Sequence, residues 1–99
     1  MTELIAVIDR YQELLQKWIH IYAELLDEDK ELEQRAGSIG LTFPFNYAKP
    51  KSVAAVCVWA AGRQLKKEIP PKKIVGVSAI SMTTFQNIKN HLRKKGVVE

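Results

Sequence analysis

The sequence predicts an all-α protein that folds as one domain of five helices and ends in a helix-turn-helix. Apolar residues recur at spacings of three and four through residues 4–26, and an unbroken apolar run fills residues 53–61. Proline, glycine and serine stand between these segments, at points where helices begin or end. At 99 residues the chain can bury one modest core and is too short for two. We therefore expect residues 1–99 to form a single domain.

Composition limits where the protein works. Its one cysteine, Cys57, cannot form an internal disulfide and suits a reducing compartment. No apolar run approaches the roughly 18 residues that a membrane-spanning helix needs. The first ten residues include Glu3 and lack the basic region of a signal peptide. We expect a cytoplasmic protein that does not bind membranes.

The net charge of +4 conceals a division between the two halves of the chain. Residues 1–48 hold four Lys or Arg against nine Asp or Glu, a net charge of −5. Residues 49–99 hold eleven against two, a net charge of +9. Such a separation within one small domain favours an anionic partner for the second half.

The first helix is expected from about Thr2 to Asp27, because no proline or glycine interrupts the periodic stripe. Further apolar residues widen this stripe beyond the narrow seam of a two-stranded coiled coil. It therefore favours a helix docked into its own domain, with a homodimer through helix 4–25 as the alternative. The stripe consists of Leu4, Ile8, Tyr11, Leu15, Trp18, Tyr22 and Leu25.

An acidic run and a connector follow the first helix. Residues 27–35 are expected to form a solvated face that either continues the helix or begins a short second one. Gly37 and Gly40 are predicted to stop that helix. Three alternating aromatic residues of the connector are expected to close the edge of the core: Phe43, Phe45 and Tyr47.

The third helix is expected to be buried on all sides. Pro50 closes the preceding loop, and Ser52 is a suitable N-cap. Every residue from 53 to 61 is apolar, and the alanines among them allow neighbouring helices to approach closely. Cys57 and Trp59 are therefore interpreted as core residues.

The last two helices are predicted from their start and stop signals. Pro71 suits the first turn of a short helix that lasts to about Val77. After a turn, Ser81 caps a longer helix that runs to about Lys95, and Gly96 ends it. Three residues at helical spacing should face inward, namely Phe85, Ile88 and Leu92.

Two helices joined by a tight turn make a helix-turn-helix, and the polar face of the second one suits DNA. Gln and Asn side chains carry the paired donor and acceptor that read adenine in the major groove. The residues expected to point outward are Met82, Thr83, Gln86, Asn87, Asn90 and Arg93. Cations expected to neutralise phosphates are Lys72, Lys73, Lys89, Arg93, Lys94 and Lys95. The alternative is that these side chains are only the solvated face of a packed helix.

Two motifs carry a family resemblance. Residues 49–55, KPKSVAA, and the aromatic Trp59 match a Ser-Pro-x-Ser-x-Ala-Ala-Ala stretch that enters a buried helix. Thr84, Phe85 and Asn87 match a Thr-(Ile/Val)-Arg-Asn-Arg-Tyr motif in the last helix. Residues 49–95 thus resemble the cyclin-like repeat, best the second repeat, of archaeal transcription factor B and eukaryotic transcription factor IIB. Three positions depart from the motif: Gln86, Ile88 and Lys89.

The resemblance implies a cyclin-like fold whose helix-turn-helix lies in the major groove beside a TATA box, with TATA-binding protein as a partner. It assigns Thr83, Thr84, Gln86 and Asn87 to bases, and Lys51, Lys72, Lys73 and Arg93 to phosphates. With Met82 and Asn90, the candidate base contacts number six. The two missing arginines should weaken phosphate or guanine contacts. One cysteine cannot build the family's zinc ribbon, so we do not expect a complete initiation factor.

Three functions remain open from the sequence. The first is a nucleoid-associated DNA-binding transcription regulator or accessory factor, of an archaeon or archaeal virus, that works with TATA-binding protein or another transcription protein. The second is a cyclin-fold module that binds proteins without sequence-specific DNA binding. The third is a dimeric helix-turn-helix repressor, whose half-sites would lie about 34 Å apart. An enzyme is not expected, because no acid or nucleophile is placed in sequence to make His20 or His91 a general base, and no cofactor or metal site is predicted.

Overall fold

The computed structural model of the protein describes residues 2–43 and 47–97, with side chains from residue 10 onward. Within these ranges the chain is all-helical, so the prediction of an all-α domain with five helices is confirmed. The helices are α1 (Thr2–Leu25), α2 (Lys30–Gly40), α3 (Pro50–Gln64), α4 (Pro71–Ser78) and α5 (Met82–Lys94). None of the helices in the described ranges is long and apolar enough to cross a lipid bilayer.

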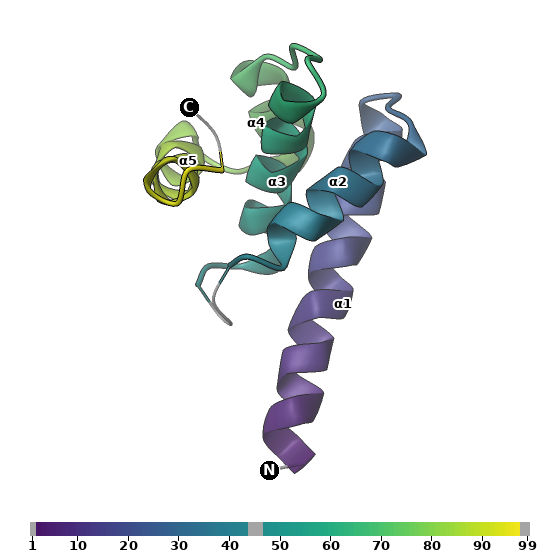
Figure 1. Ribbon diagram of the computed structural model, residues 1–99, viewed down its shortest axis with the longest axis vertical. Helices are drawn as coiled ribbons and strands as arrows, with labels where there is room; N and C mark the ends of the chain where they lie inside the picture. Colours follow the sequence, from purple (N-terminus) through teal and green to yellow (C-terminus); the bar gives the residue numbers. More distant parts are fainter. Residues whose placement is uncertain (1, 44–46, 98–99) are drawn as a thin grey trace.

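α3 is the central element, and every other helix packs against it (Figure 1). α1 and α2 cross one side of α3, while α4 and α5 cover another. The N-terminal turns of α1 project beyond the rest of the molecule. The acidic and basic halves of the sequence therefore lie on different sides of one core.

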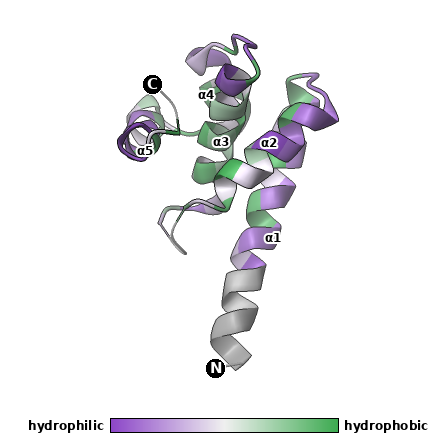
Figure 2. Ribbon diagram, viewed as in Figure 1, coloured by the Kyte–Doolittle hydropathy of each residue, from purple (hydrophilic) through white to green (hydrophobic). Residues whose placement is uncertain are grey.

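α3 is buried along most of its length, as its composition predicts. Each residue from 53 to 61 is at most 4 % exposed. Four of these residues are alanines, which let the neighbouring helices come close. Figure 2 shows α3 as the most uniformly hydrophobic helix among those coloured. Cys57 and Trp59 are both core residues, and burial raises the pKa of the Cys57 thiol.

α1 docks into its own domain through the middle of the predicted stripe. Of its members, Tyr11, Leu15 and Tyr22 are buried and Trp18 is half-buried, and Ile19 beside the stripe is buried as well. Leu25 was expected in this stripe, but its side chain is 60 % exposed. The helix ends at Leu25, and Leu26 turns into the core instead. Leu4 and Ile8 lie outside the residues whose side chains are described.

α2 begins where the acidic run is interrupted, and Asp29 caps it by accepting a hydrogen bond from the Leu32 amide at 3.0 Å. The prediction that Gly37 stops this helix is wrong, since α2 continues to Gly40. A Cβ on Gly37 would lie 2.7 Å from the side-chain oxygen of Gln16 on α1. That oxygen is the far end of an exposed, flexible side chain, which can shift to admit a Cβ, so Gly37 is a buried residue of α2 that faces α1.

The entry into α3 also differs from the prediction. The helix begins at Pro50, preceded by Lys49, which makes no side-chain cap bond. Ser52 is thus not the N-cap but a buried residue of the first turn. Proline suits this first position because the first amide groups of a helix have no partner within it. Phe43 closes the core edge as expected, Tyr47 is 38 % exposed, and Phe45 lies outside the described residues.

α4 and α5 form the predicted helix-turn-helix. Ala79 ends α4 in the left-handed conformation, with a φ of 57°. The Ser81 hydroxyl then accepts a hydrogen bond from the Thr84 amide at 3.1 Å and caps α5, as predicted. Gly96 follows α5 with a φ of 75°, which suits glycine at a helix end.

Candidate nucleic-acid interface

Three buried side chains fix the rotation of α5 about its axis. Phe85, Ile88 and Leu92 are at most 3 % exposed, as their spacing predicts. The Phe85 ring meets the Trp59 ring of α3 edge-on, with the centroids 5.6 Å apart. The opposite side of α5 is consequently held toward solvent.

The outer face of α5 consists of the six exposed side chains that the sequence predicts to point outward: Met82, Thr83, Gln86, Asn87, Asn90 and Arg93. The Gln86 amide contacts the Met82 sulfur at 3.8 Å. Thr83, Asn87 and Asn90 have side chains without a hydrogen-bond partner among the described residues. Thr84, the other candidate base contact, is only half-exposed, and its hydroxyl accepts from Ser81 at 2.8 Å.

The expected phosphate contacts do not all lie together. Lys72 and Lys73 are exposed at the start of α4, and Lys94 is exposed at the end of α5. The Lys95 ammonium instead donates to the Thr42 carbonyl at 3.1 Å. Lys51 lies on the α1 side of the molecule, with its ammonium 5.7 Å from the centre of the Trp18 ring.

Lys89 is half-buried and faces a pocket of about 590 Å³ between α3, α5 and the segment that joins α3 to α4. We call it the Trp59 pocket; its lining is Trp59, Arg63, Lys66, Lys67, Glu68, Ile69, Pro70, Pro71 and Lys89. The Lys89 ammonium lies 5.1 Å and the Arg63 guanidinium 5.5 Å from the centre of the Trp59 ring. These distances are typical of cation–π contacts, so the ring helps to hold both cations in place.

The cations of the Trp59 pocket differ in their pairing. Lys67 contacts Glu28 at 3.2 Å and Asp29 at 3.0 Å, and hydrogen bonds to both carboxylates raise the pKa of its ammonium. Arg63, Lys66 and Lys89 pair with no carboxylate in the part of the chain that the structure describes. The pocket therefore holds three unpaired positive charges.

Arg63 and Lys66 were not among the predicted site residues. Arg63 lies in the last turn of α3 and Lys66 follows it, where both look like ordinary exposed residues at a helix end. The net charge of +9 in the second half was their only signal. Their proximity to Lys89, more than twenty residues later, depends on α5 packing across α3.

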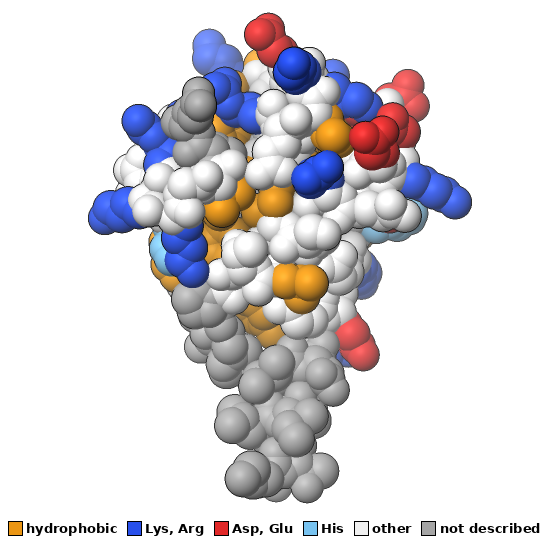
Figure 3. Space-filling view, in the orientation of Figure 1, with side chains coloured by type: hydrophobic (Ala, Val, Ile, Leu, Met, Phe, Trp, Pro, Cys, Tyr) orange, Lys and Arg blue, Asp and Glu red, His pale blue; other side chains and the backbone are white. Residues whose placement is uncertain are grey.

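The surface reflects the division of charge along the chain. In Figure 3, basic side chains gather over α5 and around the upper end of α3 and α4. Acidic side chains gather near the junction of α1 and α2. Basic side chains thus lie along the edge that presents α5, and others lie over the top of the molecule and near α2.

Both histidines contact other side chains of the domain: His91 contacts aromatic rings, and His20 contacts carboxylates. The His91 ring lies 4.3 Å from Tyr47 and 5.2 Å from Phe43, centre to centre. Burial lowers its pKa, and the nearby Lys95 and Lys94 add to this. His20 contacts Glu33 at 2.7 Å and Glu24 at 3.1 Å, and the hydrogen bond to Glu33 raises its pKa most.

Comparisons with known proteins give no relative. The chain matches no protein-family model, no curated protein and no solved structure.

Proposed function

We propose that this protein binds double-stranded DNA through α4 and α5 and regulates transcription. α5 enters the major groove with its outer face, and α4 lies across the sugar–phosphate backbone. Thr83, Gln86, Asn87 and Asn90 read base edges, while Lys72, Lys73 and Arg93 contact phosphates.

The observation that carries this proposal is the outer face of α5. Its inner residues, Phe85 and Ile88, account for how the helix packs, so the polar residues opposite are not needed for the core. Three of these polar side chains have no internal hydrogen bond among the described residues. Uncommitted amides on a helix beside a basic surface match what reading of adenine in the major groove requires.

The charge distribution supports the same partner. DNA attracts a protein largely through its phosphates, and the cations that face them set the salt dependence of binding. Lys72, Lys73 and Lys94 are exposed near the two ends of the helix pair. The acidic side chains near the α1–α2 junction lie away from α5 (Figure 3).

A second candidate function is a protein-binding module that has lost sequence-specific DNA binding. Ile88, which replaces an arginine of the transcription factor B motif, is 3 % exposed. Lys89 lies against Trp59 in place of the motif's tyrosine. Neither residue therefore lies on the outer face of α5, which leaves fewer positions for base contacts than the motif provides.

Fluorescence anisotropy with two labelled duplexes tests the proposal. One duplex carries a TATA element, as the resemblance suggests, and the other has the same bases in scrambled order. We expect tighter binding to the TATA duplex, with an affinity that falls steeply as salt rises. Binding to neither duplex at near-physiological salt would reject DNA binding and leave the protein-binding module.

A pair of variants distinguishes base-specific recognition from sequence-independent electrostatic binding. Gln86→Ala/Asn87→Ala should remove the preference between duplexes, because each good base contact contributes about 1–3 kcal/mol of discrimination. Gln34→Ala, which removes an exposed amide from α2, is the control and should keep the preference. Equal behaviour of the two variants would mean that α5 does not read bases.

A further inference from the structure

We propose that the Trp59 pocket binds a backbone phosphate of the same duplex that α5 reads. This inference rests on the proposed function and assigns a role to Arg63 and Lys66, which lie outside the helix-turn-helix. Together with Lys89 they supply three positive charges without carboxylate partners in the described part of the chain. The occupant is a phosphodiester of nucleic acid.

Charge favours an anion in this pocket. Of the lining side chains, Lys67 is neutralised by Glu28 and Asp29. Glu68 is the one carboxylate in the lining, against the three unpaired cations. The local balance therefore stays positive, and an incoming phosphate would relieve repulsion among cations held close together.

The geometry favours phosphate among anions. The planar guanidinium of Arg63 presents a fork of donors that fits two oxygens of one phosphate. The Trp59 ring holds Arg63 and Lys89 near its face, so less side-chain freedom is lost on binding. The pocket volume of about 590 Å³ has room for a phosphate with its neighbouring sugars.

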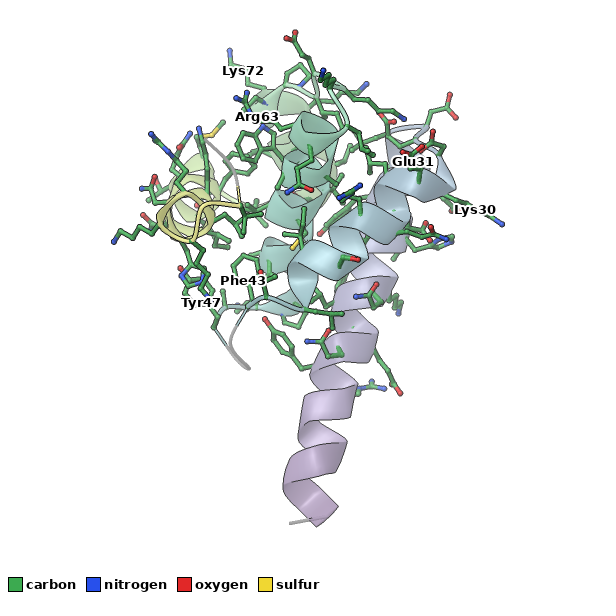
Figure 4. The ribbon with its side chains drawn as sticks, in the orientation of Figure 1. Lys30, Glu31, Phe43, Tyr47, Arg63 and Lys72 are labelled. Carbon is green, nitrogen blue, oxygen red and sulfur yellow. The ribbon has the colours of Figure 1, made fainter. Side chains whose placement is uncertain are left out.

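The position of the pocket links it to the DNA surface. Lys89 lies on α5, between Gln86 and Asn90 of the outer face in sequence, so the pocket borders that face. In Figure 4, Arg63 lies at the upper end of α3, and Pro71, the first residue of α4, lines the same pocket. A helix lying in the major groove is flanked by the phosphates of both strands, and this side of α5 meets one of them.

The main test changes only residues that are not on α5. Arg63→Gln/Lys66→Gln removes two pocket cations, both exposed, and leaves the outer face of α5 intact. Lys30→Gln/Arg35→Gln is the matched control, since it removes two exposed cations from α2; Lys30 points away from α5 in Figure 4. Both variants lower the net charge by two.

The readout is the slope of log affinity against log salt for both duplexes. We expect the pocket variant to lower the magnitude of this slope by about one, since one phosphate contact is lost, and to weaken both duplexes equally, because phosphate contacts carry no sequence preference. The α2 control should keep the wild-type slope. Equal slopes for the pocket variant, the control and the wild type would overturn the proposal that the Trp59 pocket binds a phosphate. The proposal that α5 reads bases would still stand.

A second readout reports on the pocket itself. Trp18→Phe leaves Trp59 as the one tryptophan of the chain. Duplex DNA should shift the emission of Trp59 as it draws Arg63 and Lys89 toward a phosphate, and inorganic phosphate at the same molar concentration should not. A response to inorganic phosphate alone would identify a small-anion site and overturn the assignment to nucleic acid. If DNA fails to bind at all, the pocket assignment and the proposed function both fall.

Discussion

α3 and α5 pack against each other through Trp59 and Phe85, but they differ in how much of their surface is buried. Along α3, residues 53–61 are at most 4 % exposed, so packing accounts for every one of them. α5 is buried along Phe85, Ile88 and Leu92, and the rest of its surface is polar except for the exposed Met82. Packing therefore accounts for the residue types along α3, whereas the residue types on the outer face of α5 are best accounted for by a binding partner.

The sharpest test places the same new carboxylate in both helices. Ala55→Asp buries an unpaired charge in α3 and should lower the free energy of unfolding by more than about 4 kcal/mol. Asn87→Asp adds the charge to the exposed face of α5 and should change that free energy by less than about 0.5 kcal/mol. Urea denaturation followed by circular dichroism measures both.

The two variants should also differ in binding. Asn87→Asp keeps the fold but brings a negative charge to the DNA, so its affinity for duplexes should fall. An Asn87→Asp protein that unfolds like Ala55→Asp would show that the outer face of α5 is part of the core. A folded Asn87→Asp variant with wild-type affinity would mean that DNA does not bind to the outer face of α5.

The sequence predicts these two helices well because their signals are local. The inward positions of α5 follow from helical spacing, and the Ser81 cap follows from residue type at a helix start. The buried length of α3 follows from an apolar run with no polar face. These features depend on neighbours within a few residues, all visible in one sequence.

Most of the features that were predicted wrongly or missed depend on contacts between distant segments; the cap of α3, which falls at Lys49 and not at Ser52, is a local exception. Gly37 resembles a stop signal, but it is a buried residue within α2 that faces Gln16 of α1. Lys95 is exposed, and the hydrogen bond from its ammonium to the Thr42 carbonyl, more than fifty residues away, is not visible in the sequence. The Trp59 pocket joins Arg63 to Lys89 only after α5 has packed on α3. No local pattern carries that information.

A smaller effect is expected at the boundary between the turn and α5. Ser81→Ala removes the side chain that accepts from the Thr84 amide and should destabilise the domain by about 1 kcal/mol. Ser81→Asn keeps a capping oxygen and should restore most of the loss. Urea midpoints of the three proteins give the comparison. If alanine and asparagine behave alike, the cap does not hold the first turn that carries Thr83.

The smallest effects concern the two histidines, whose pKa values shift in opposite directions. The carboxylates of Glu33 and Glu24 raise the pKa of His20, so its stabilisation is present below about pH 6.5 and is lost as pH rises through the folded value. Burial, Lys95 and Lys94 lower the pKa of His91. Its stabilisation is therefore present above about pH 6.5 and is lost as pH falls through the folded value.

Single histidine variants separate the two opposite pH dependences of stability. His91→Gln retains His20, so the urea midpoint should fall as pH rises from roughly 6 to 8. His20→Gln retains His91, so the midpoint should rise as pH rises from roughly 5 to 7. The double variant supplies the pH dependence of all other groups and is subtracted from both. Because His20 is exposed and solvent screens its pairs, its slope should be the weaker one. If the midpoint of His20→Gln falls as pH rises, the surroundings of His91 favour its charged form, contrary to the expectation from its burial.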